Sequence, residues 1–324
     1  ENSDIKITPR KNIKVNLDDG SGIPRNCPNM LIERDGKFYL YKDCGSRVVL
    51  LDCEKLAKNK EFWKLNDMDI SSDEKFIIFT IDTNGDGLCD IYMKYLFDEK
   101  IFKIENKGEE KMSGDVSISP DNSKVYYITC DKDNRRSSLY YYDLVSLKNI
   151  KVYYEADRSY GMSITVTSDR SKTVMVIGSY SNNEVYEVID STTKLILSRR
   201  EEVNYSVDYY LNKWYVLVNN KEKSYLITLN DNLEVEVLLN NVKNKEIAEF
   251  YIKYGYIFVI FLYEGRFILD ILELCSKRMI KTIFLDDIYK INFPGLSNLD
   301  VFNNILVLEY TTFIKPISYI VIDL

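Results

Sequence analysis

The stretch from Ser71 to Leu96, SSDEKFIIFTIDTNGDGLCDIYMKYL, predicts a strand, a tight polar loop and a second strand. The segment Lys75–Ile81 is almost entirely apolar, as expected of a strand buried on both faces. The loop Asp82–Asp90 is rich in Asp, Asn and Gly, which tolerate the backbone of sharp turns. The return strand Ile91–Leu96 carries apolar and long amphipathic side chains. We take this hairpin as the unit on which the fold is built.

The hairpin recurs along the chain. The segments SPDNSKVYYITCD and TSDRSKTVMVIGS repeat its Ser/Thr-x-Asp turn, and the aspartates Asp73, Asp121 and Asp169 are each 48 residues apart. A polar loop and a second strand follow each time. Weaker copies lack the turn signature and occupy these segments: Met30–Glu33, Lys37–Tyr41, Arg47–Leu51, Asn212–Asn219, Ser224–Leu229, Tyr254–Tyr263, Arg266–Leu274, Asn303–Tyr310 and Ile317–Leu324.

Together these copies make seven units. A period in the forties that is built of hairpins is typical of a β-propeller, whose blades bury their faces by stacking on neighbours. We therefore predict an all-β fold, a seven-bladed β-propeller, as a single domain over residues 28–324 after a lead-in segment, residues 1–27. A two-sheet sandwich is the competing all-β interpretation, but it does not predict a constant period.

Five further segments have a predicted local structure. The tyrosine runs Tyr126–Tyr127, Tyr140–Tyr142 and Tyr153–Tyr154 are expected to pack between blades, with a ligand platform as the alternative. The segment Cys53–Leu65 indicates a short helix or turn. The segment Glu105–Gly114, ENKGEEKMSG, is interpreted as a charged, exposed loop.

The chain contains no histidine, which excludes a Ser-His-Asp or Cys-His site and any zinc site with a histidine ligand. No G-x-S-x-G nucleophile motif occurs either. We therefore do not expect this chain alone to be a hydrolase, although chemistry by two carboxylates stays open. The net charge of −7 disfavours nucleic acid as a partner. The longest uncharged apolar run, Tyr254–Tyr263, is too short to cross a membrane, so no membrane partner is expected.

The six cysteines form no CxxC pair and are irregularly spaced. Free thiols in a reducing compartment fit this usage better than a disulfide framework, and we predict a cytoplasmic location.

The loop Asp82–Asp90 also has the spacing of a calcium loop. Oxygen-bearing residues stand at positions 1, 3, 5 and 9, which are Asp82, Asn84, Asp86 and Asp90, and a glycine stands at position 6. An EF-hand needs an acidic residue at position 12, where this chain has Met93. Two interpretations are left, a calcium site held by those four side chains and a plain hairpin turn with solvated acids. No other cofactor is expected.

The motifs also resemble those of a known family, the N-terminal propeller domain of oligopeptidase B in the prolyl oligopeptidase group of serine peptidases. The resemblance covers about residues 28 to 324 and lies in these segments: DMDISSDEKFIIFTIDTNGDGLCDIYMKYL, SISPDNSKVYYITCD, VYYEADRSYGMSITVTSDRSKTVMVIG, YSVDYYLNKWYVLVNN, IAEFYIKYGYIFVIFLYEGRFILDILEL and TTFIKPISYIVIDL. Two residues, Gly87 and Asp90, depart from the family's usual loop.

The resemblance implies a non-catalytic domain that restricts access to the active site of a peptidase. In this family the propeller caps an α/β-hydrolase domain, admits short peptides and serves cleavage after basic residues. The catalytic residues lie after the propeller, so none is assigned here, and the expected partners are short peptides and an α/β-hydrolase domain. A stand-alone protein-binding scaffold and a calcium-stabilised, integrin-like propeller are the alternatives.

Overall fold

The structure is a computed structural model and describes residues 14–17, 31–34, 37–42, 46–98, 100–106, 110–240, 245–285, 288–293, 305–312 and 318–324. Nearly all of these residues lie in β-strands or in the turns between them, which confirms the all-β prediction. A helix of five residues, α1 (Cys53–Ala57), lies where the sequence indicates a short helix. The described residues contain no helix with the length and apolar character that a membrane crossing requires.

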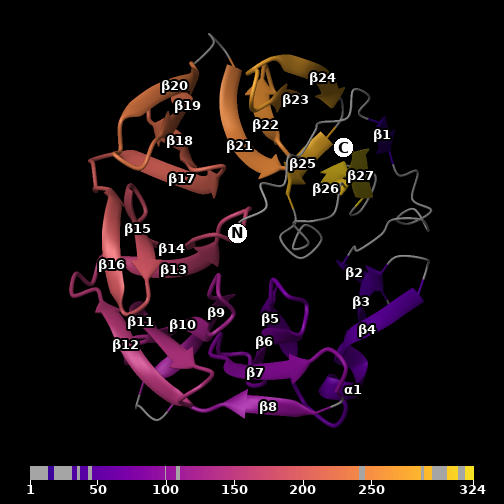
Figure 1. Cartoon of the computed structure of the whole chain (residues 1–324), viewed down its shortest axis with the longest axis vertical. Helices are drawn as coiled ribbons and strands as arrows, with labels where there is room; N and C mark the ends of the chain where they lie inside the picture. Colours follow the sequence, from indigo (N-terminus) through magenta and orange to yellow (C-terminus); the bar gives the residue numbers. More distant parts are fainter. Residues whose placement is uncertain are drawn as a thin grey trace, which may run out of the picture. The chain divides into compact units, whose positions relative to one another are not determined.

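The strands of the described residues form antiparallel sheets, six of four strands and one of three (Figure 1). The three-stranded sheet contains β2 (Leu31–Arg34), β3 (Lys37–Lys42) and β4 (Ser46–Asp52). The next three sheets follow in chain order: β5 (Lys64–Ile70), β6 (Phe76–Asp82), β7 (Asp90–Tyr95) and β8 (Ile101–Ile104); β9 (Lys111–Ile118), β10 (Lys124–Cys130), β11 (Arg136–Asp143) and β12 (Lys148–Tyr154); β13 (Gly161–Val166), β14 (Thr173–Gly178), β15 (Asn183–Ile189) and β16 (Thr192–Leu197).

The remaining sheets are β17 (Val203–Tyr210), β18 (Lys213–Asn220), β19 (Ser224–Leu229) and β20 (Val235–Leu239); β21 (Lys245–Lys253), β22 (Tyr256–Tyr263), β23 (Arg266–Glu273) and β24 (Met279–Leu285); and β25 (Ile288–Asn292), β26 (Ile305–Thr312), β27 (Ser318–Asp323) and β1 (Lys14–Leu17). In the first two of these sheets consecutive strands are again neighbours, whereas the last sheet takes its fourth strand from β1. Strand β1 lies inside the predicted lead-in segment and pairs with β27, with Lys14 opposite Asp323.

The hairpin predicted from the sequence is present with shifts of one residue. Strand β6 spans Phe76–Asp82, and all seven of its residues are buried. Each of the other predicted strand segments overlaps a strand of the structure.

The Ser/Thr-x-Asp turn has a physical basis that repeats from sheet to sheet. The hydroxyl oxygen of its first residue (Ser71, Ser119 or Thr167) accepts a hydrogen bond from the backbone N–H of the lysine that leads into the next strand. The residue three positions after that hydroxyl takes a left-handed backbone, with φ of 52° at Glu74, 58° at Asn122 and 56° at Arg170. This closes a tight turn between the first two strands of each of these sheets.

The prediction of an exposed loop over residues 105–114 is wrong for its second half. Strand β9 begins at Lys111, and Met112 and Ser113 are buried. Gly114 has φ of 97°, and a Cβ there would lie 2.2 Å from Nδ2 of Asn66. The strand pairing with β10 is irregular at this point. The glycine and the lysine therefore belong to a bulged strand that approaches its neighbour closely, and such residues look like a loop in sequence.

By backbone contacts the chain divides into two compact units. Unit 1 comprises Glu1–Ile32, Tyr39–Val48 and Tyr210–Leu324, and unit 2 comprises Glu33–Phe38 and Val49–Tyr209.

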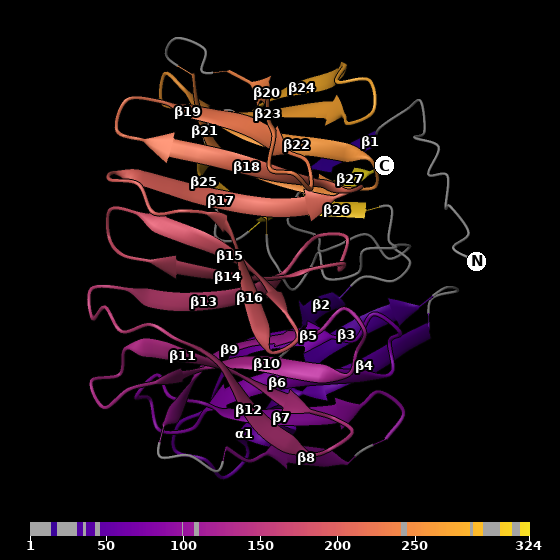
Figure 2. The ribbon, with the colours of Figure 1, turned by 60° about the vertical axis from the view of Figure 1, so that its left-hand side comes forward.

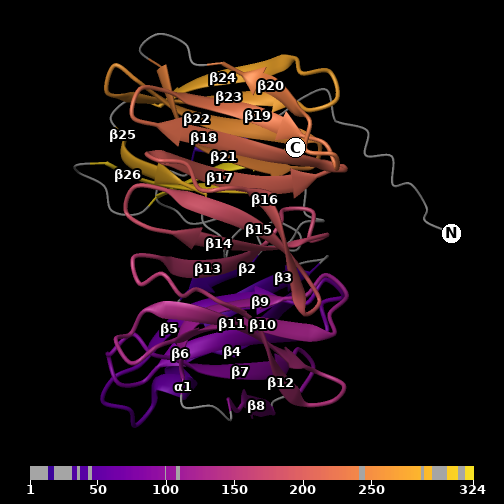
Figure 3. The same cartoon turned by 90° about the vertical axis from the view of Figure 1, so that its left-hand side faces the viewer.

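Within unit 2 the tyrosine runs fill the space between neighbouring sheets. Neighbouring residues of a strand point to opposite faces. Thus Tyr127 packs with Ile78 and Ile91 of the sheet β5–β8, whereas Tyr126 packs with Met162 of the sheet β13–β16. The sheets β5–β8 and β9–β12 are seen together in the lower part of Figure 3. The predicted packing role is confirmed for these tyrosines.

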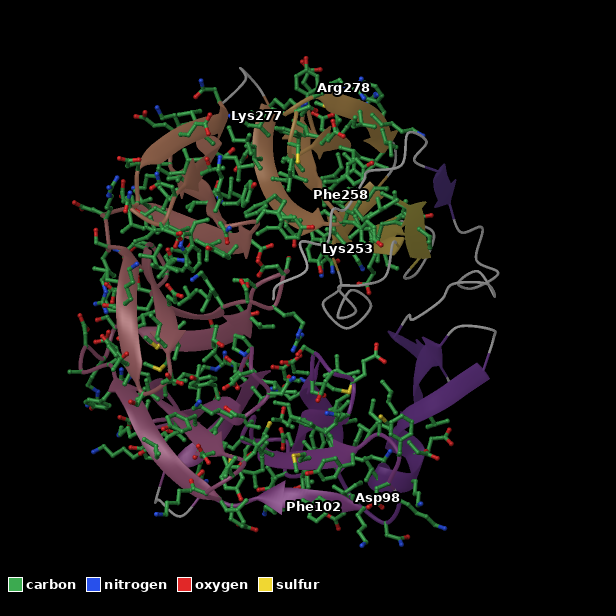
Figure 4. All side chains as sticks on the ribbon, viewed as in Figure 1. Asp98, Phe102, Lys253, Phe258, Lys277 and Arg278 are labelled. Carbon is green, nitrogen blue, oxygen red and sulfur yellow. The ribbon has the colours of Figure 1, made fainter. Side chains whose placement is uncertain are left out.

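Within unit 1 the same alternation joins the sheets that contain β18, β22 and β26. Ile257 packs against Leu217 and Leu226, and Phe258, the next residue, packs against Leu306 and Leu308. Figure 2 shows β18 and β22 side by side, and Figure 4 marks Phe258 among the packed side chains.

Candidate functional site

The loop between β6 and β7 is held by the carboxylate of Asp82. Its Oδ1 accepts hydrogen bonds from the backbone N–H groups of Asn84 (2.9 Å) and Gly85 (2.8 Å), and its Oδ2 accepts one from Gly87 (2.9 Å). Burial disfavours the ionised carboxylate, but the three N–H donors outweigh it and lower the pKa of Asp82. Asp82 is only 4% exposed and acts as the cap of the turn.

Of the other three predicted calcium ligands, Asn84 and Asp86 are exposed on the same loop, and Asp90 is the first residue of β7. Asp86 Oδ1 accepts a hydrogen bond from the N–H of Leu88 at 3.1 Å. Asp90 Oδ2 lies 3.1 Å from Nζ of Lys103. In the part of the chain that the structure describes, no group of three or more Cys, Asp and Glu side chains is arranged to hold a metal ion. Calcium binding by Asp82, Asn84, Asp86 and Asp90 stays a prediction.

A cleft of about 240 Å³ opens beside this loop, and we call it the acidic cleft. It lies between the β6–β7 loop, the end of β8 and the start of β9. Its lining residues are Ile81, Thr83, Asn84, Asp86, Leu88, Cys89, Asp90, Lys103, Glu105, Asn106, Glu110, Lys111 and Met112. Four of these carry a negative charge and two a positive charge, so the cleft favours cationic groups.

A larger cleft of about 510 Å³, the basic cleft, lies between the start of β9, the β10–β11 loop and the end of β12. It is lined by Glu110, Lys111, Cys130, Asp131, Lys132, Asn134, Ser137, Lys151 and Tyr154. Three lysines face two acids here. Its charge balance is therefore the reverse of that in the acidic cleft.

Glu110 stands where the two clefts meet and is firmly held. Its Oε2 accepts a hydrogen bond from Oγ1 of Thr129 at 2.5 Å, and its Oε1 lies 3.0 Å from Nζ of Lys151. Burial opposes ionisation, but these two partners lower the pKa of Glu110. The ammonium of Lys151 also lies 5.2 Å and 5.1 Å from the ring centres of Tyr140 and Tyr154. A hydrogen bond, an ion pair and two ring contacts therefore orient the charged groups of Glu110 and Lys151.

A third set of residues, which the sequence did not indicate, joins the sheets of unit 2. Strand β9 lies at the edge of its sheet, so its outward N–H groups have no partner strand. The N–H groups of Val116 and Ile118 donate instead to two carboxyl oxygens of β5, Asp67 Oδ2 at 3.2 Å and Asp69 Oδ2 at 2.8 Å. Arg170, in the β13–β14 turn, donates to Asp69 Oδ1 at 3.0 Å. The carboxylates thus satisfy a buried strand edge that has no neighbouring strand.

The turn pattern contains a signal that could have found these contacts. In two of the three turns the residue in the left-handed position, Asn122 or Arg170, contacts the sheet β5–β8 through its side chain. Asn122 Oδ1 accepts hydrogen bonds from N and Oγ of Ser72, and Arg170 donates to the backbone oxygen of Ile70. Polar side chains at that position therefore indicate a contact between sheets.

The thiols agree with the prediction where they are described. Cys53, Cys89, Cys130 and Cys275 are free. Cys27 and Cys44 lie outside the described residues.

Comparisons with known proteins identify the fold. A family model described as "Prolyl oligopeptidase, N-terminal beta-propeller domain" matches residues 30–324. A dipeptidyl aminopeptidase BI from Pseudoxanthomonas mexicana is 21% identical over 183 residues, which are 55% of this chain and 25% of that protein.

Solved structures show the same architecture. Oligopeptidase B from Leishmania major superimposes with a TM-score of 0.73 at 14% identity, over 92% of this chain and 47% of that one. Oligopeptidase B from Trypanosoma brucei has a TM-score of 0.72 at 14% identity, over 91% and 47%. The chain thus spans about half the length of these proteins. Because the family model covers nearly the whole sequence, the chain belongs to the prolyl oligopeptidase N-terminal β-propeller domain family.

Proposed function

We propose that this chain is the non-catalytic, substrate-gating propeller domain of an oligopeptidase-B-like serine peptidase, which cleaves short peptides after basic residues. The proposal rests on two facts together, the match to the propeller family model and the absence of histidine from the chain. The propeller model covers residues 30–324, and the same chain has no histidine. A Ser-His-Asp triad must then come from another part of the protein.

The proposal includes the number of blades. In the part of the chain that the structure describes, six four-stranded sheets and the sheet β2–β4 correspond one to one with the seven units of the sequence repeat. We propose that each sheet is a blade. The strand β1, paired with β27, then completes the last blade with the beginning of the chain.

The proposed physical mechanism is selection by size and charge. A ring of blades has a narrow central channel, which excludes folded proteins and passes short peptides. The net charge of −7 raises the local concentration of basic peptides around the domain. Movement of the propeller relative to a hydrolase domain opens the gap between them. The free thiols support a cytoplasmic location.

The reading frame after Leu324 tests the proposal directly. We expect it to encode a G-x-S-x-G motif and a later histidine. The full-length product is expected to hydrolyse short peptides after Lys or Arg and to leave a folded protein substrate intact. A stop codon directly after Leu324 contradicts the peptidase assignment.

A stand-alone binding scaffold is the second candidate. The acidic and basic clefts favour it, because they provide a polar recognition surface that needs no catalytic domain. A stop codon after Leu324, together with peptide binding by the chain alone, supports this second function.

A further inference from the structure

We propose that the acidic and basic clefts together bind both charged ends of one short peptide, with the amino end in the acidic cleft and the carboxylate end in the basic cleft. This inference goes beyond the proposed function, since it holds whether or not a hydrolase domain accompanies the chain.

The two clefts are neighbours that share two lining residues. Both are lined by Glu110 and Lys111, at the start of β9. An extended peptide that passes over these two residues therefore reaches both clefts. Their volumes, about 240 and 510 Å³, together lie in the range of small-molecule sites, roughly 300 to 1,000 Å³.

The basic cleft provides donors for a carboxylate. Among the described residues, neither Lys111 nor Lys132 pairs with an acidic side chain, and both are exposed. Ser137 is 1% exposed and lines the same cleft, and its hydroxyl is buried without a hydrogen-bond partner. Buried hydroxyls normally have a partner. A ligand carboxylate between the two lysines supplies an acceptor for the Ser137 hydroxyl.

The acidic cleft provides acceptors for an ammonium group. Asp90 is already paired with Lys103, so the carboxylates of Asp86 and Glu105 face the cleft as its remaining acidic groups beside Glu110. Glu110 itself is occupied by Thr129 and Lys151. The amino end of the peptide is therefore assigned to Asp86 and Glu105.

The opposite charges of the two clefts favour a peptide over a simple ion. An inorganic anion satisfies only the basic cleft, and a metal or amine satisfies only the acidic one. A zwitterionic peptide of a few residues satisfies both, since an extended chain spans about 3.3 Å per residue.

Tetraalanine is a probe that isolates the two termini, because its side chains carry no charge. We would measure its affinity for the chain by calorimetry in four forms: free, N-acetylated, C-amidated and blocked at both ends. Each block is expected to weaken binding about two- to fivefold, as loss of one partly exposed charge pair does. Equal affinity for all four forms, or no binding at millimolar peptide, overturns the proposal.

Two variants assign each terminus to its cleft. Lys132→Met is expected to weaken binding of free tetraalanine and to abolish the effect of amidation, while acetylation keeps its effect. Asp86→Asn keeps the acceptor for the N–H of Leu88 and is expected to abolish the effect of acetylation only. Lys148→Met and Glu61→Gln remove the same charges outside the clefts and should bind like wild type. If these controls weaken binding as much as the cleft variants, charge alone explains the result and the site is rejected.

Discussion

Arg170 and Asp69 are 101 positions apart in sequence and form a buried ion pair, with Nη2 3.0 Å from Oδ1 and side chains only 7% and 6% exposed. Arg170 also donates to the backbone oxygen of Ile70 at 2.7 Å. The pair connects the turn after β13 to the first strand of the sheet β5–β8. Both partners have further hydrogen bonds, so removal of either leaves a buried polar group without its partner.

Removal of the Arg170 side chain is expected to destabilise the folded chain strongly. Arg170→Ala leaves the Asp69 carboxylate buried beside an empty space, and we expect the free energy of unfolding to fall by about 3 to 5 kcal/mol. Urea unfolding followed by tyrosine and tryptophan fluorescence measures this change. The double variant Arg170→Ala, Asp69→Asn should recover part of the loss, because the unpaired charge is gone.

The pair Arg158–Asp133 is the matched control. It is also an Arg–Asp ion pair, but its side chains are 69% and 50% exposed. Arg158→Ala should cost about 1 kcal/mol or less. Equal losses for Arg158→Ala and Arg170→Ala would show that the buried pair adds no specific stability.

Gly114 is expected to tolerate no side chain. A Cβ there would lie 2.2 Å from Nδ2 of Asn66 and 2.9 Å from Sγ of Cys89, at a φ of 97°. We expect Gly114→Ala to destabilise the chain by at least about 2 kcal/mol, from backbone strain and overpacking together. Gly265→Ala separates the two causes, since φ is 78° there and nothing lies within 4 Å of the added Cβ. Gly265→Ala should lower the free energy of unfolding by about 1 kcal/mol, from backbone strain alone. An equally small loss for Gly114→Ala would refute the steric argument.

Asp208 is expected to make stability depend on pH. Burial raises the pKa of this carboxyl to about 7, against the hydrogen bonds that its Oδ1 accepts from Ser168 and Tyr209. The folded chain then binds a proton that the unfolded chain releases near pH 4, so the contribution of Asp208 to stability falls as pH rises from about 4 to about 7. Asp208→Asn should therefore gain stability relative to wild type between pH 5 and pH 8 in urea titrations.

Asp121 provides the opposite case. Burial is outweighed by hydrogen bonds from Ser119 and Ser123, and its pKa is lowered to about 2. The contribution of Asp121 to the free energy of unfolding is present above about pH 4 and is lost as the pH falls towards about 2. Asp121→Asn should thus change stability by the same amount at pH 5 and pH 8. A constant difference for Asp208→Asn as well would rule out the assigned titration.

Calcium distinguishes the two interpretations of the loop Asp82–Asp90. If its four oxygen-bearing side chains bind the ion, millimolar calcium must raise the melting temperature, because a ligand of the native state alone stabilises it. Asp86→Ala should then remove the rise. The hairpin interpretation predicts no shift, and it also predicts that Asp82→Ala destabilises the chain, because three backbone N–H groups lose their acceptor.

The sequence by itself determined the strands and the turns between them. The burial pattern of β6, the Ser/Thr-x-Asp turns and the period of 48 residues are local properties, set by side-chain alternation and hydroxyl hydrogen bonds within a few residues. They were sufficient to predict an all-β repeat and the inter-sheet role of the tyrosines. They also placed the polar loop Asp82–Asp90 correctly between two strands.

The tertiary structure alone decided which distant residues meet. Pairing of β1 with β27, the contact of Arg170 with Asp69, and the meeting of the two clefts at Glu110 and Lys111 join residues far apart in sequence. No local pattern encodes these contacts, since they depend on how whole sheets stack. The sequence predicted an exposed loop over the charged segment before Gly114 because the strand that packs against it is distant in sequence. Only the neighbouring strand explains why a glycine and a lysine stand at the edge of a buried sheet.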